Sequence, residues 1–459
     1  MVEQFDDVVL GGGKGGKSLA IALADAGRSV ALIERGQIGG TCINVACIPT
    51  KTMVASAKLA ELAHRADEYG ISLPAPPAEL AGVIARKRRV VGDMVDTHWT
   101  LFTTTPNLSF LMGEGVFVGE RTIEVTAEDG SARAVCGERV VINTGSHTTV
   151  PAIAGLESVG YLTSTSIMEL EELPERLAII GGGYIALEFA QILRRLGSEV
   201  VVVQRGERFL PNEDRDIAEA IRTVLSEDGI EFLDNTETDS VRPGPAGVEL
   251  VYSRTGEKQS LHCSHLMVAV GRSPNTAGLG LESAGVNVNA RGAIVVNERL
   301  ETSAANVYAV GDCNGGPLFT HASWDDYRIL RANILHGAGR STAGRLMPYT
   351  LFIDPELGRV GLSEEQAVAA GYDIAVATLP AGKIPRANTA GETKGLLKAV
   401  VDRGTDQILG CSLFCHSAGE VMSVVQMAMI GKVPYPQVRD TIFTHPTMAE
   451  SLNLLFATL

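Results

Sequence analysis

The sequence is poor in cysteine, with seven among 459 residues. That number is too small for a disulfide scaffold, and in a reducing compartment closely spaced cysteines more often serve catalysis or metal binding. No apolar stretch is long enough, and free enough of charge or glycine, to span a bilayer. The acidic start, residues 1–7, lacks the basic and apolar regions of a secretory signal. We therefore expect a cytoplasmic protein.

The chain also lacks a surplus of positive charge. Its formal net charge is −15, which argues against a nucleic-acid surface or a polybasic membrane contact, although a local phosphate pocket remains compatible. The hydrophobic fraction of 45% and the charged fraction of 20% are ordinary for a folded protein. Because one core does not grow to this length, we expect three or four compact units.

A glycine-rich turn follows the first expected strand, residues 7–10. Its three spaced glycines allow a tight bend, close approach of a pyrophosphate and packing of the next helix, residues 17–24. The strand 30–33 then ends at Glu34, an acid that can bind a ribose diol. This order predicts a dinucleotide-binding domain. The three glycines are Gly11, Gly13 and Gly16.

The same pattern recurs after the expected strand 177–180. A helix over 187–196 and a strand over 200–203 follow the turn, which predicts a second dinucleotide-binding domain rather than a solenoid. Two such domains imply two bound nucleotides. The residues of the second turn are Gly181, Gly183 and Ala186.

The second nucleotide is expected to be NADPH, although NADH is the alternative. An acid at the end of strand 200–203 would favour the free 2′-hydroxyl of NADH, but Gln204 stands there, with Arg205 and Arg208 close by. Arginines suit a 2′-phosphate. The opposing interpretation is that both arginines are solvated loop charges.

Further segments outline the remaining organisation. Apolar runs at 140–145 and 266–272 resemble return strands of the two domains, and 307–312 ends in an Asp. The stretch 337–345 is the best linker candidate. The last part has no glycine-rich turn, so it is not a third nucleotide domain, and we expect a terminal helix from about Thr447.

Cys42 and Cys47 lie four residues apart in the run 39–51. Pro49 suits the first turn of a helix, and a thiol at a helix N-terminus is stabilised as a thiolate. Lys51 adds positive charge one turn later. Cys47 is therefore expected to be a thiolate and Cys42 its disulfide partner. The alternatives are two buried small hydrophobes, or a zinc site, for which no further ligands lie nearby.

His445 precedes the expected terminal helix, and Glu450 is expected within it. A carboxylate can hold one imidazole nitrogen and leave the other for acid–base work, which thiol–disulfide exchange needs. The alternative is a histidine in a capping turn.

Cys411 and Cys415 share one face if their segment is a strand. Three interpretations are open for them: core cysteines, a metal site with His416, or a second redox pair.

The glycine turns, the Cys-x4-Cys run and His-Pro-Thr-x-x-Glu occur in an order that resembles the flavin-dependent pyridine nucleotide–disulfide oxidoreductases. The resemblance extends along essentially the whole chain. The segments 13–20 and 39–52 are most similar to the mercuric-reductase-like branch, which includes the reactive-chlorine-resistance copper reductase. The family implies an α/β fold, with two Rossmann-like domains for FAD and NAD(P)H and an α+β C-terminal dimerisation domain.

The resemblance implies four parts and a homodimer. They are an FAD-binding domain (1–150), an NAD(P)H-binding domain (151–272), a central domain completing the FAD site (273–345) and the dimerisation domain (346–459). His445 and Glu450 would reach into the partner's active site, so a monomer should be inactive. No metal site is predicted.

The resemblance also implies roles for individual residues. Cys42 would be the interchange thiol that meets substrate, and Cys47 the thiol in charge-transfer contact with flavin. Tyr184 would cover the flavin until nicotinamide enters, and Lys51 and Glu188 would pair beside flavin N5. FAD would bind the first glycine turn, with Glu34 on the adenosine ribose and Asp312 on the ribityl chain. Further cofactor contacts would come from Thr41, Lys51, Gly115, Thr144, Gly145, Gly181, Gly183, Arg205, Gly271 and Gly311.

Two departures bear on the substrate. Mercuric reductases carry a vicinal cysteine pair at the C-terminus, and residues 454–459 contain none. They also lack the histidine of His-Pro-Thr, which is present here as His445. We therefore expect electrons to pass from NADPH through flavin and the Cys42–Cys47 disulfide to a disulfide substrate. The alternatives are a copper or mercury ion, a biosynthetic dithiol or disulfide, and a flavin redox sensor without turnover.

Overall fold

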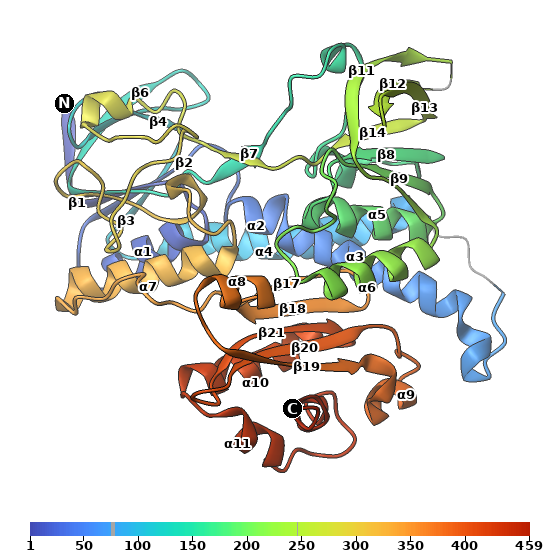
Figure 1. Cartoon of the computed structure of the whole chain (residues 1–459). Coiled ribbons are helices and arrows are strands. Elements are labelled where there is room, and N and C mark those ends of the chain that lie inside the picture. The colour runs from blue at the N-terminus through green and yellow to red at the C-terminus, as the bar shows by residue number, and fades with distance from the viewer. Residues whose placement is uncertain (75–78, 246) are drawn as a thin grey trace. The chain divides into compact units, whose positions relative to one another are not determined.

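The computed structural model describes residues 1–74, 79–245 and 247–459. Its segments form two compact units, coloured along the chain in Figure 1. Unit 1 comprises residues 1–52, 85–149 and 271–345, and unit 2 comprises residues 53–84, 150–270 and 346–459. Each unit combines segments of more than one of the four expected domains, so that division stays a prediction.

Unit 1 is built on a seven-stranded sheet with the order β3-β2-β1-β6-β5-β4, in which β16 also pairs with β6. Strands β3, β2, β1, β6 and β16 are parallel, whereas β5 and β4 are antiparallel. The strands are β1 (Val2–Leu10), β2 (Val30–Glu34), β3 (Leu108–Met112), β4 (Glu114–Phe117), β5 (Thr122–Thr126), β6 (Ala132–Ile142) and β16 (Val307–Ala309). A short antiparallel pair, β7 (Ser146–Thr148) and β15 (Arg272–Pro274), completes the unit.

Both faces of the unit 1 sheet are buried, which explains the apolar runs of its central strands. Val8 and Leu10 belong to one core cluster, while Val9 joins Leu19 and Leu23 of α1 in another. This alternation follows from the two-residue period of a strand. The helices of unit 1 are α1 (Lys14–Asp25), α2 (Thr41–Asn44) and α7 (Thr320–His336); α3 (Cys47–His64) begins in unit 1 and α4 (Leu80–Thr104) ends in it.

Unit 2 contains a second parallel sheet, with the order β10-β9-β8-β14. Its elements are β8 (Arg176–Ile180), α5 (Tyr184–Leu196), β9 (Glu199–Val203), α6 (Arg215–Glu227), β10 (Ile230–Leu233) and β14 (His265–Val268), with an antiparallel sheet of β11 (Thr236–Gly244), β12 (Gly247–Arg254) and β13 (Glu257–Cys263). The repeated strand–turn–helix–strand order confirms the two Rossmann-like parts of the expected fold class.

The C-terminal part of unit 2 is an antiparallel sheet with the order β17-β18-β21-β20-β19, drawn in orange to red in Figure 1. Its elements are β17 (Tyr349–Leu351), β18 (Glu356–Gly361), α8 (Glu364–Ala369), β19 (Ile374–Pro380), α9 (Pro385–Thr389), β20 (Leu396–Asp402), β21 (Ile408–Cys415), α10 (Ala418–Ile430), α11 (Tyr435–Asp440) and α12 (Ser451–Phe456). Across both units, the described residues also form six short 3₁₀ helices. They are η1 (Ala66–Tyr69), η2 (Leu156–Ser158), η3 (Ser166–Glu169), η4 (Leu281–Ala284), η5 (Gly311–Asn314) and η6 (Ala381–Lys383). Mixed helices and antiparallel strands agree with the expected α+β domain.

Two details of the C-terminal part refine the expectations. The terminal helix begins at Ser451 rather than near Thr447, and Glu450 precedes it. The Thr447 hydroxyl donates to the Thr444 carbonyl at 2.7 Å and so supports a turn in place of helix. Cys411 and Cys415 are buried in one core cluster, where burial raises the pKa of both thiols.

The described helices include none that is long and apolar enough to cross a membrane. Within residues 1–74, 79–245 and 247–459, no group of three or more His, Cys, Asp and Glu side chains is placed to hold a metal ion. The metal-site alternative for Cys411 and Cys415 therefore has no support.

A buried polar network joins the loop before α6 to β17 and β18 within unit 2. Glu213 accepts hydrogen bonds from the hydroxyls of Tyr184 and Tyr349, the second at 2.6 Å. It also pairs with Arg359, Nη1 to Oε2 at 3.0 Å, and the two side chains are 0% and 4% exposed. Removing one partner of a buried pair leaves the other charge without compensation.

We expect Glu213→Leu to lower the free energy of unfolding by about 3–5 kcal/mol, because Arg359 loses its buried countercharge. Urea unfolding followed by circular dichroism measures the change. Glu365→Gln is the control, since Glu365 pairs with Arg208 and Arg215 at the surface and should cost less than about 1 kcal/mol. Equal effects from both variants would contradict this account.

Candidate active site

The first glycine turn has no room for side chains. A Cβ on Gly11 would lie 2.3 Å from the Asn143 carbonyl oxygen, and one on Gly16 would lie 2.3 Å from the Gly11 carbonyl oxygen. Gly13 precedes α1, and a Cβ there would lie 3.1 Å from the Asn143 side chain. The start of α1 therefore presents bare backbone, as a bound pyrophosphate requires.

Asn143 holds this turn and was not identified from the sequence. Its Oδ1 accepts from the Gly16 N–H at 2.8 Å, and its Nδ2 donates to the Val310 carbonyl at 2.8 Å. The side chain thus ties α1 to the ends of β6 and β16. The signal that the sequence offered for Asn143 was an asparagine directly after a buried strand.

Glu34 ends β2 beside the turn, as expected for an acid that binds a ribose. Its Oε2 accepts from the Gly12 N–H at 2.9 Å and its Oε1 from the Gly36 N–H at 3.0 Å. These bonds fix the carboxylate next to the glycine turn. The residues of this cradle fit the adenosine half of FAD.

The other residues expected to contact FAD are spread over unit 1. The Asp312 carboxylate accepts from Ser146 at 2.5 Å, and the Thr144 hydroxyl donates to the Asn275 carbonyl at 2.7 Å. Gly311 packs against Ser323. Cofactor contact stays a prediction for all of them.

Several of the expected glycines differ in what surrounds them. Open space lies beyond Gly145 and Gly271, which both have positive φ. Gly115 instead lies inside the sheet, where a Cβ would be 2.6 Å from Leu10. Core packing thus explains the glycine at position 115. Thr41 is the first residue of α2.

The second glycine turn repeats this geometry in unit 2. A Cβ on Gly181 would lie 2.4 Å from the Ala269 carbonyl oxygen, and one on Gly182 would lie 2.0 Å from Gln204 Oε1. Gln204 thus occupies the position that Glu34 has in unit 1. Gly183 borders open space at the start of α5.

The two arginines after β9 have different surroundings. Arg208 pairs with Glu365 at 2.8 Å and donates to the Glu213 carbonyl at 2.8 Å. Arg205 is exposed, and no ion pair involves it in the described part of the chain. A contact between Arg205 and a nucleotide phosphate stays a prediction.

The cysteine segment lies directly on the first glycine turn. A Cβ on Gly40 would come within 2.5 Å of the Gly13 Cα, so the two backbones meet there. Asn44 closes the loop, because its Nδ2 donates to the carbonyls of Ile38 and Gly40 at 2.9 Å each. Cys42 lies in α2, a short helix that the sequence did not predict.

Cys47 is the first residue of α3, as the sequence predicted. Its sulfur lies 3.2 Å from the hydroxyl of Thr320, the first residue of α7. Arg272 is a further neighbour: burial lowers the pKa of Arg272, while the charges of Asp312 and Cys47 oppose that shift. Thr320 and Arg272 come from distant segments, and nothing near the cysteines in sequence indicated them.

Both cysteines are free thiols in this structure, and their surroundings differ. The pKa of Cys42 is raised, first by its hydrogen bond with the Cys47 side chain, then by burial and by the negative charge of Cys47. Thr320 and Lys17 act in the opposite direction. A thiolate at Cys47, which its position at the start of α3 favours, stays a prediction.

Tyr184 is the first residue of α5, and its ring stacks on Tyr349 with centroids 5.6 Å apart. Burial, followed by the charge of Glu213, raises its pKa, so the phenol stays protonated. Glu188 is buried on α5 and accepts from the Phe352 N–H at 3.0 Å. Lys51, one turn into α3, belongs to the other unit, so the Lys51–Glu188 pair stays a prediction.

His445 and Glu450 are in contact near the C-terminus. The imidazole Nδ1 lies 2.9 and 3.0 Å from the two carboxylate oxygens of Glu450. A carboxylate can only accept, so Nδ1 carries the proton and Nε2 remains for acid–base work. The histidine side chain is 66% exposed.

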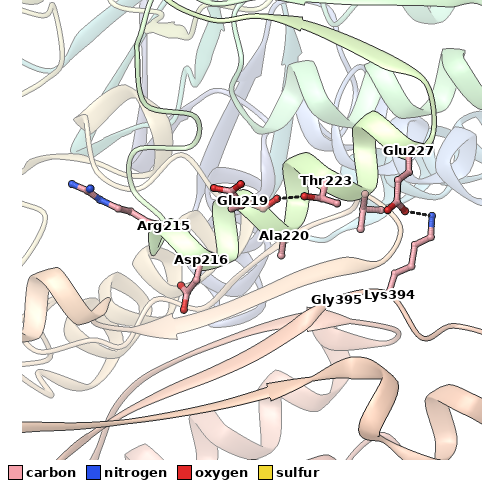
Figure 2. A pocket seen from close by; sticks show the side chains of 9 residues that line it. Arg215, Asp216, Glu219, Ala220, Thr223, Glu227, Lys394 and Gly395 are labelled. Carbon is pink, nitrogen blue, oxygen red and sulfur yellow. Dashed lines mark hydrogen bonds and ion pairs between the residues drawn. The ribbon is translucent and has the colours of Figure 1, made fainter.

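A surface hollow of about 620 Å³ lies along α6 in unit 2 (Figure 2). Lys394 pairs there with Glu227 at 2.8 Å, and the Thr223 hydroxyl donates to the Glu219 carbonyl at 2.9 Å. The hollow contains none of the residues predicted for the active site. Lys394 is already paired with Glu227, so we assign the hollow no part in the reaction.

Comparison with known proteins gives a consistent result over the full length. Residues 5–326 match the family described as pyridine nucleotide-disulphide oxidoreductase, and residues 347–455 match its dimerisation domain. The chain is 42% identical to the probable pyridine nucleotide-disulfide oxidoreductase RclA of Escherichia coli over 99% of both chains. It is 34% identical to a mercuric reductase of Staphylococcus aureus over 98% of this chain and 81% of the relative.

A solved structure supports the same conclusion. The Cu(II) complex of the HOCl-induced flavoprotein disulfide reductase RclA from Escherichia coli superimposes with a TM-score of 0.91 at 40% identity, over 99% of each chain. The family implies a flavin and a pyridine nucleotide, which suit the two glycine turns. The sequence, the fold and these relatives agree that the chain belongs to the pyridine nucleotide–disulfide oxidoreductases and is an oxidoreductase.

Proposed function

We propose that this protein is a homodimeric, FAD-dependent reductase that uses NADPH and the Cys42–Cys47 dithiol to reduce a disulfide substrate. The contact between His445 and Glu450 is the observation that carries the choice of substrate. A disulfide releases thiolates that need protons, and a histidine held in one tautomer can deliver them. A metal ion needs electrons but no proton.

The position of this pair supports the proposed dimer. The chain has the dimerisation domain of the family, over residues 347–455. His445 is exposed and points its free nitrogen away from Glu450. In a homodimer it would serve the cysteine pair of the partner subunit, which explains an acid–base group so exposed in one chain.

Different residues of the chain would carry out different parts of the reaction. Bound flavin would supply the electron-transfer chemistry that links the nicotinamide to the cysteine pair. Cys47 and Asp312 both act on Arg272, and Asp312 is predicted to bind the flavin, so Cys47 would face the flavin and Cys42 would meet the substrate. Tyr184 would cover the flavin until the nicotinamide enters.

NADPH is favoured over NADH by two residues after β9. Gln204 supplies no negative charge to repel a 2′-phosphate, and Arg205 is exposed to bind one. Arg208 is already paired with Glu365.

A thiophilic metal ion is the second candidate acceptor. The relatives include mercuric reductases and a protein solved as a Cu(II) complex. Cys42 and Cys47 are close enough to hydrogen-bond, so two sulfurs are available to a soft ion.

We expect His445→Ala to separate these candidates. The rate of NADPH-dependent disulfide reduction should fall by roughly 100-fold or more, because the leaving thiolate loses its proton donor. Reduction of Cu(II) or Hg(II) should change by less than about threefold, since no proton is transferred. Steady-state assays with a panel of low-molecular-weight disulfides and with each ion measure both rates.

Cys47→Ser is the companion variant for this experiment. It should abolish reduction of either acceptor while flavin stays bound. Full activity of Cys47→Ser would reject the dithiol route altogether. Equal loss of disulfide and metal reduction in His445→Ala would reject the choice of a disulfide.

We expect Arg205→Ala to raise the KM for NADPH by about tenfold, the value of roughly one charged contact, and to leave the KM for NADH within about twofold. Arg215→Ala is the matched control, because Arg215 is an exposed arginine at the start of α6 whose side chain pairs with Glu365. Parallel initial-rate measurements with the two nucleotides test this. An equal rise for both would show that Arg205 does not contact the 2′-phosphate.

A further inference from the structure

Lys17 is a buried lysine beside the cysteine pair whose presence the proposed function does not explain. It lies on α1 and is 5% exposed. Its Nζ contacts His98 Nε2 on α4, and no ion pair with a carboxylate involves it among the described residues. A buried ammonium without a countercharge is costly, so its surroundings need an explanation.

His98 accepts the hydrogen bond from Lys17 as a neutral imidazole. Its Nδ1 lies 2.6 Å from the Met94 carbonyl oxygen, which can only accept, so Nδ1 carries the ring proton. Nε2 therefore has a free lone pair and accepts a hydrogen bond from the Lys17 Nζ. Burial, with the charges of Lys17 and Lys14, lowers the pKa of His98 and keeps the ring neutral.

The charged neighbours of Lys17 are Lys14 and Cys42. Burial and the charge of Lys14 lower the pKa of Lys17 to about 8, and a charge on Cys42 acts in the opposite direction. Lys14 is itself engaged, with Nζ 3.6 Å from the centre of the Trp324 ring. Among the residues that the structure describes, Cys42 is thus the neighbour of Lys17 whose ionisation would supply a negative charge.

His98 also anchors the loop that holds Cys42. A Cβ on Gly39 would lie 3.4 Å from the His98 ring, so the imidazole packs against the segment leading into α2. The three elements α1, α2 and α4 therefore meet around Lys17. Cys47 has a different cation, Arg272, from β15.

We propose that Lys17 is the counter-ion of Cys42 and stabilises its thiolate once the cysteine pair is reduced, with His98 as the residue that orients the lysine. The proposal rests on the proposed function only in treating Cys42 as the sulfur that attacks the acceptor. It adds a charge beside Cys42 that belongs to the same subunit, in contrast to His445 of the partner subunit.

The proton and electron balance is simple. The Cys42 thiol loses its proton to solvent, and the thiolate that remains pairs with the Lys17 ammonium. The thiolate attacks one sulfur of the acceptor disulfide, that S–S bond breaks, and the departing thiolate takes a proton from the imidazolium of the partner subunit's His445. Cys47 then attacks the Cys42 sulfur, releases the second acceptor thiolate and closes the Cys42–Cys47 disulfide; the acceptor gains the two electrons that the dithiol loses.

The test is the pH profile of Cys42 alkylation in the holoenzyme after chemical reduction with a phosphine. Iodoacetamide reacts with thiolates, and fragmentation spectra of the peptide distinguish Cys42 from Cys47. Lys17→Met should move the Cys42 profile about one pH unit upward, which slows alkylation roughly tenfold near neutral pH. Lys17→Arg keeps the charge and should restore alkylation.

Companion variants keep the test decisive if Lys17→Met loses its flavin. His98→Gln retains an acceptor for Lys17 and should keep the normal profile, whereas His98→Leu should shift it upward. Lys383→Met removes an exposed lysine in unit 2 and is the control for net charge. In the unmodified enzyme the anionic reagent iodoacetate should react faster relative to iodoacetamide than it does in Lys17→Met.

Superimposable profiles for Lys17→Met and the unmodified enzyme would overturn the proposal. An equal loss of Cys42 alkylation in Lys17→Arg and Lys17→Met would also overturn the proposal, because the shape of the lysine side chain rather than its charge would then be responsible. The outcome does not depend on the physiological acceptor, since reduction is chemical and the readout is Cys42 itself. Failure of the proposed function would instead appear as an inability of NADPH to expose Cys42 to alkylation in any variant.

Discussion

The close packing of Gly40 on Gly13 is the contact on which the site depends. A Cβ at position 40 would come within 2.5 Å of the Gly13 Cα, so only bare backbone can stand there. Because α1 and α2 both start at these glycines, the phosphate-binding turn and Cys42 are held at a fixed separation. Catalytic groups must be placed to within a fraction of an ångström, and a contact between two backbones is stiffer than one between side chains.

From this anchor the two sulfurs acquire different surroundings. Cys47 is at the start of α3, with Thr320 and Arg272 as neighbours from later in the chain. Cys42 instead has Lys17 of α1 as a neighbour, and Lys17 contacts His98 of α4. Adjacent thiols would titrate as a coupled pair, and a different positive group lies near each one, Arg272 near Cys47 and Lys17 near Cys42. The asymmetry belongs to the fold of unit 1 and does not need a bound substrate.

The sequence allowed the fold class and the main site to be predicted because their signals are local. Glycine spacing after an apolar strand and a cysteine two residues before a proline each act through neighbouring residues. Thr320, Asn143 and His98 escaped prediction, since each acts on a segment far away in sequence. Lys17 did leave a signal: a lysine one turn into a helix that must pack on a sheet is out of place. The start of the last helix was wrong because the Thr447 side chain supports a turn.

The network around Glu213 has a consequence for how a nucleotide enters. The Tyr184 ring is stacked on Tyr349, and both hydroxyls share one carboxylate oxygen of Glu213. In the proposed role of Tyr184, swinging its ring aside would exchange that hydrogen bond for water and leave Tyr349 and Arg359 to share the carboxylate. Contacts of the incoming nicotinamide would have to offset that loss, so its observed affinity would be lower than its intrinsic affinity. The same displacement would also affect β17 and β18, which carry Tyr349 and Arg359. Binding of the nucleotide would then alter the packing of these two strands.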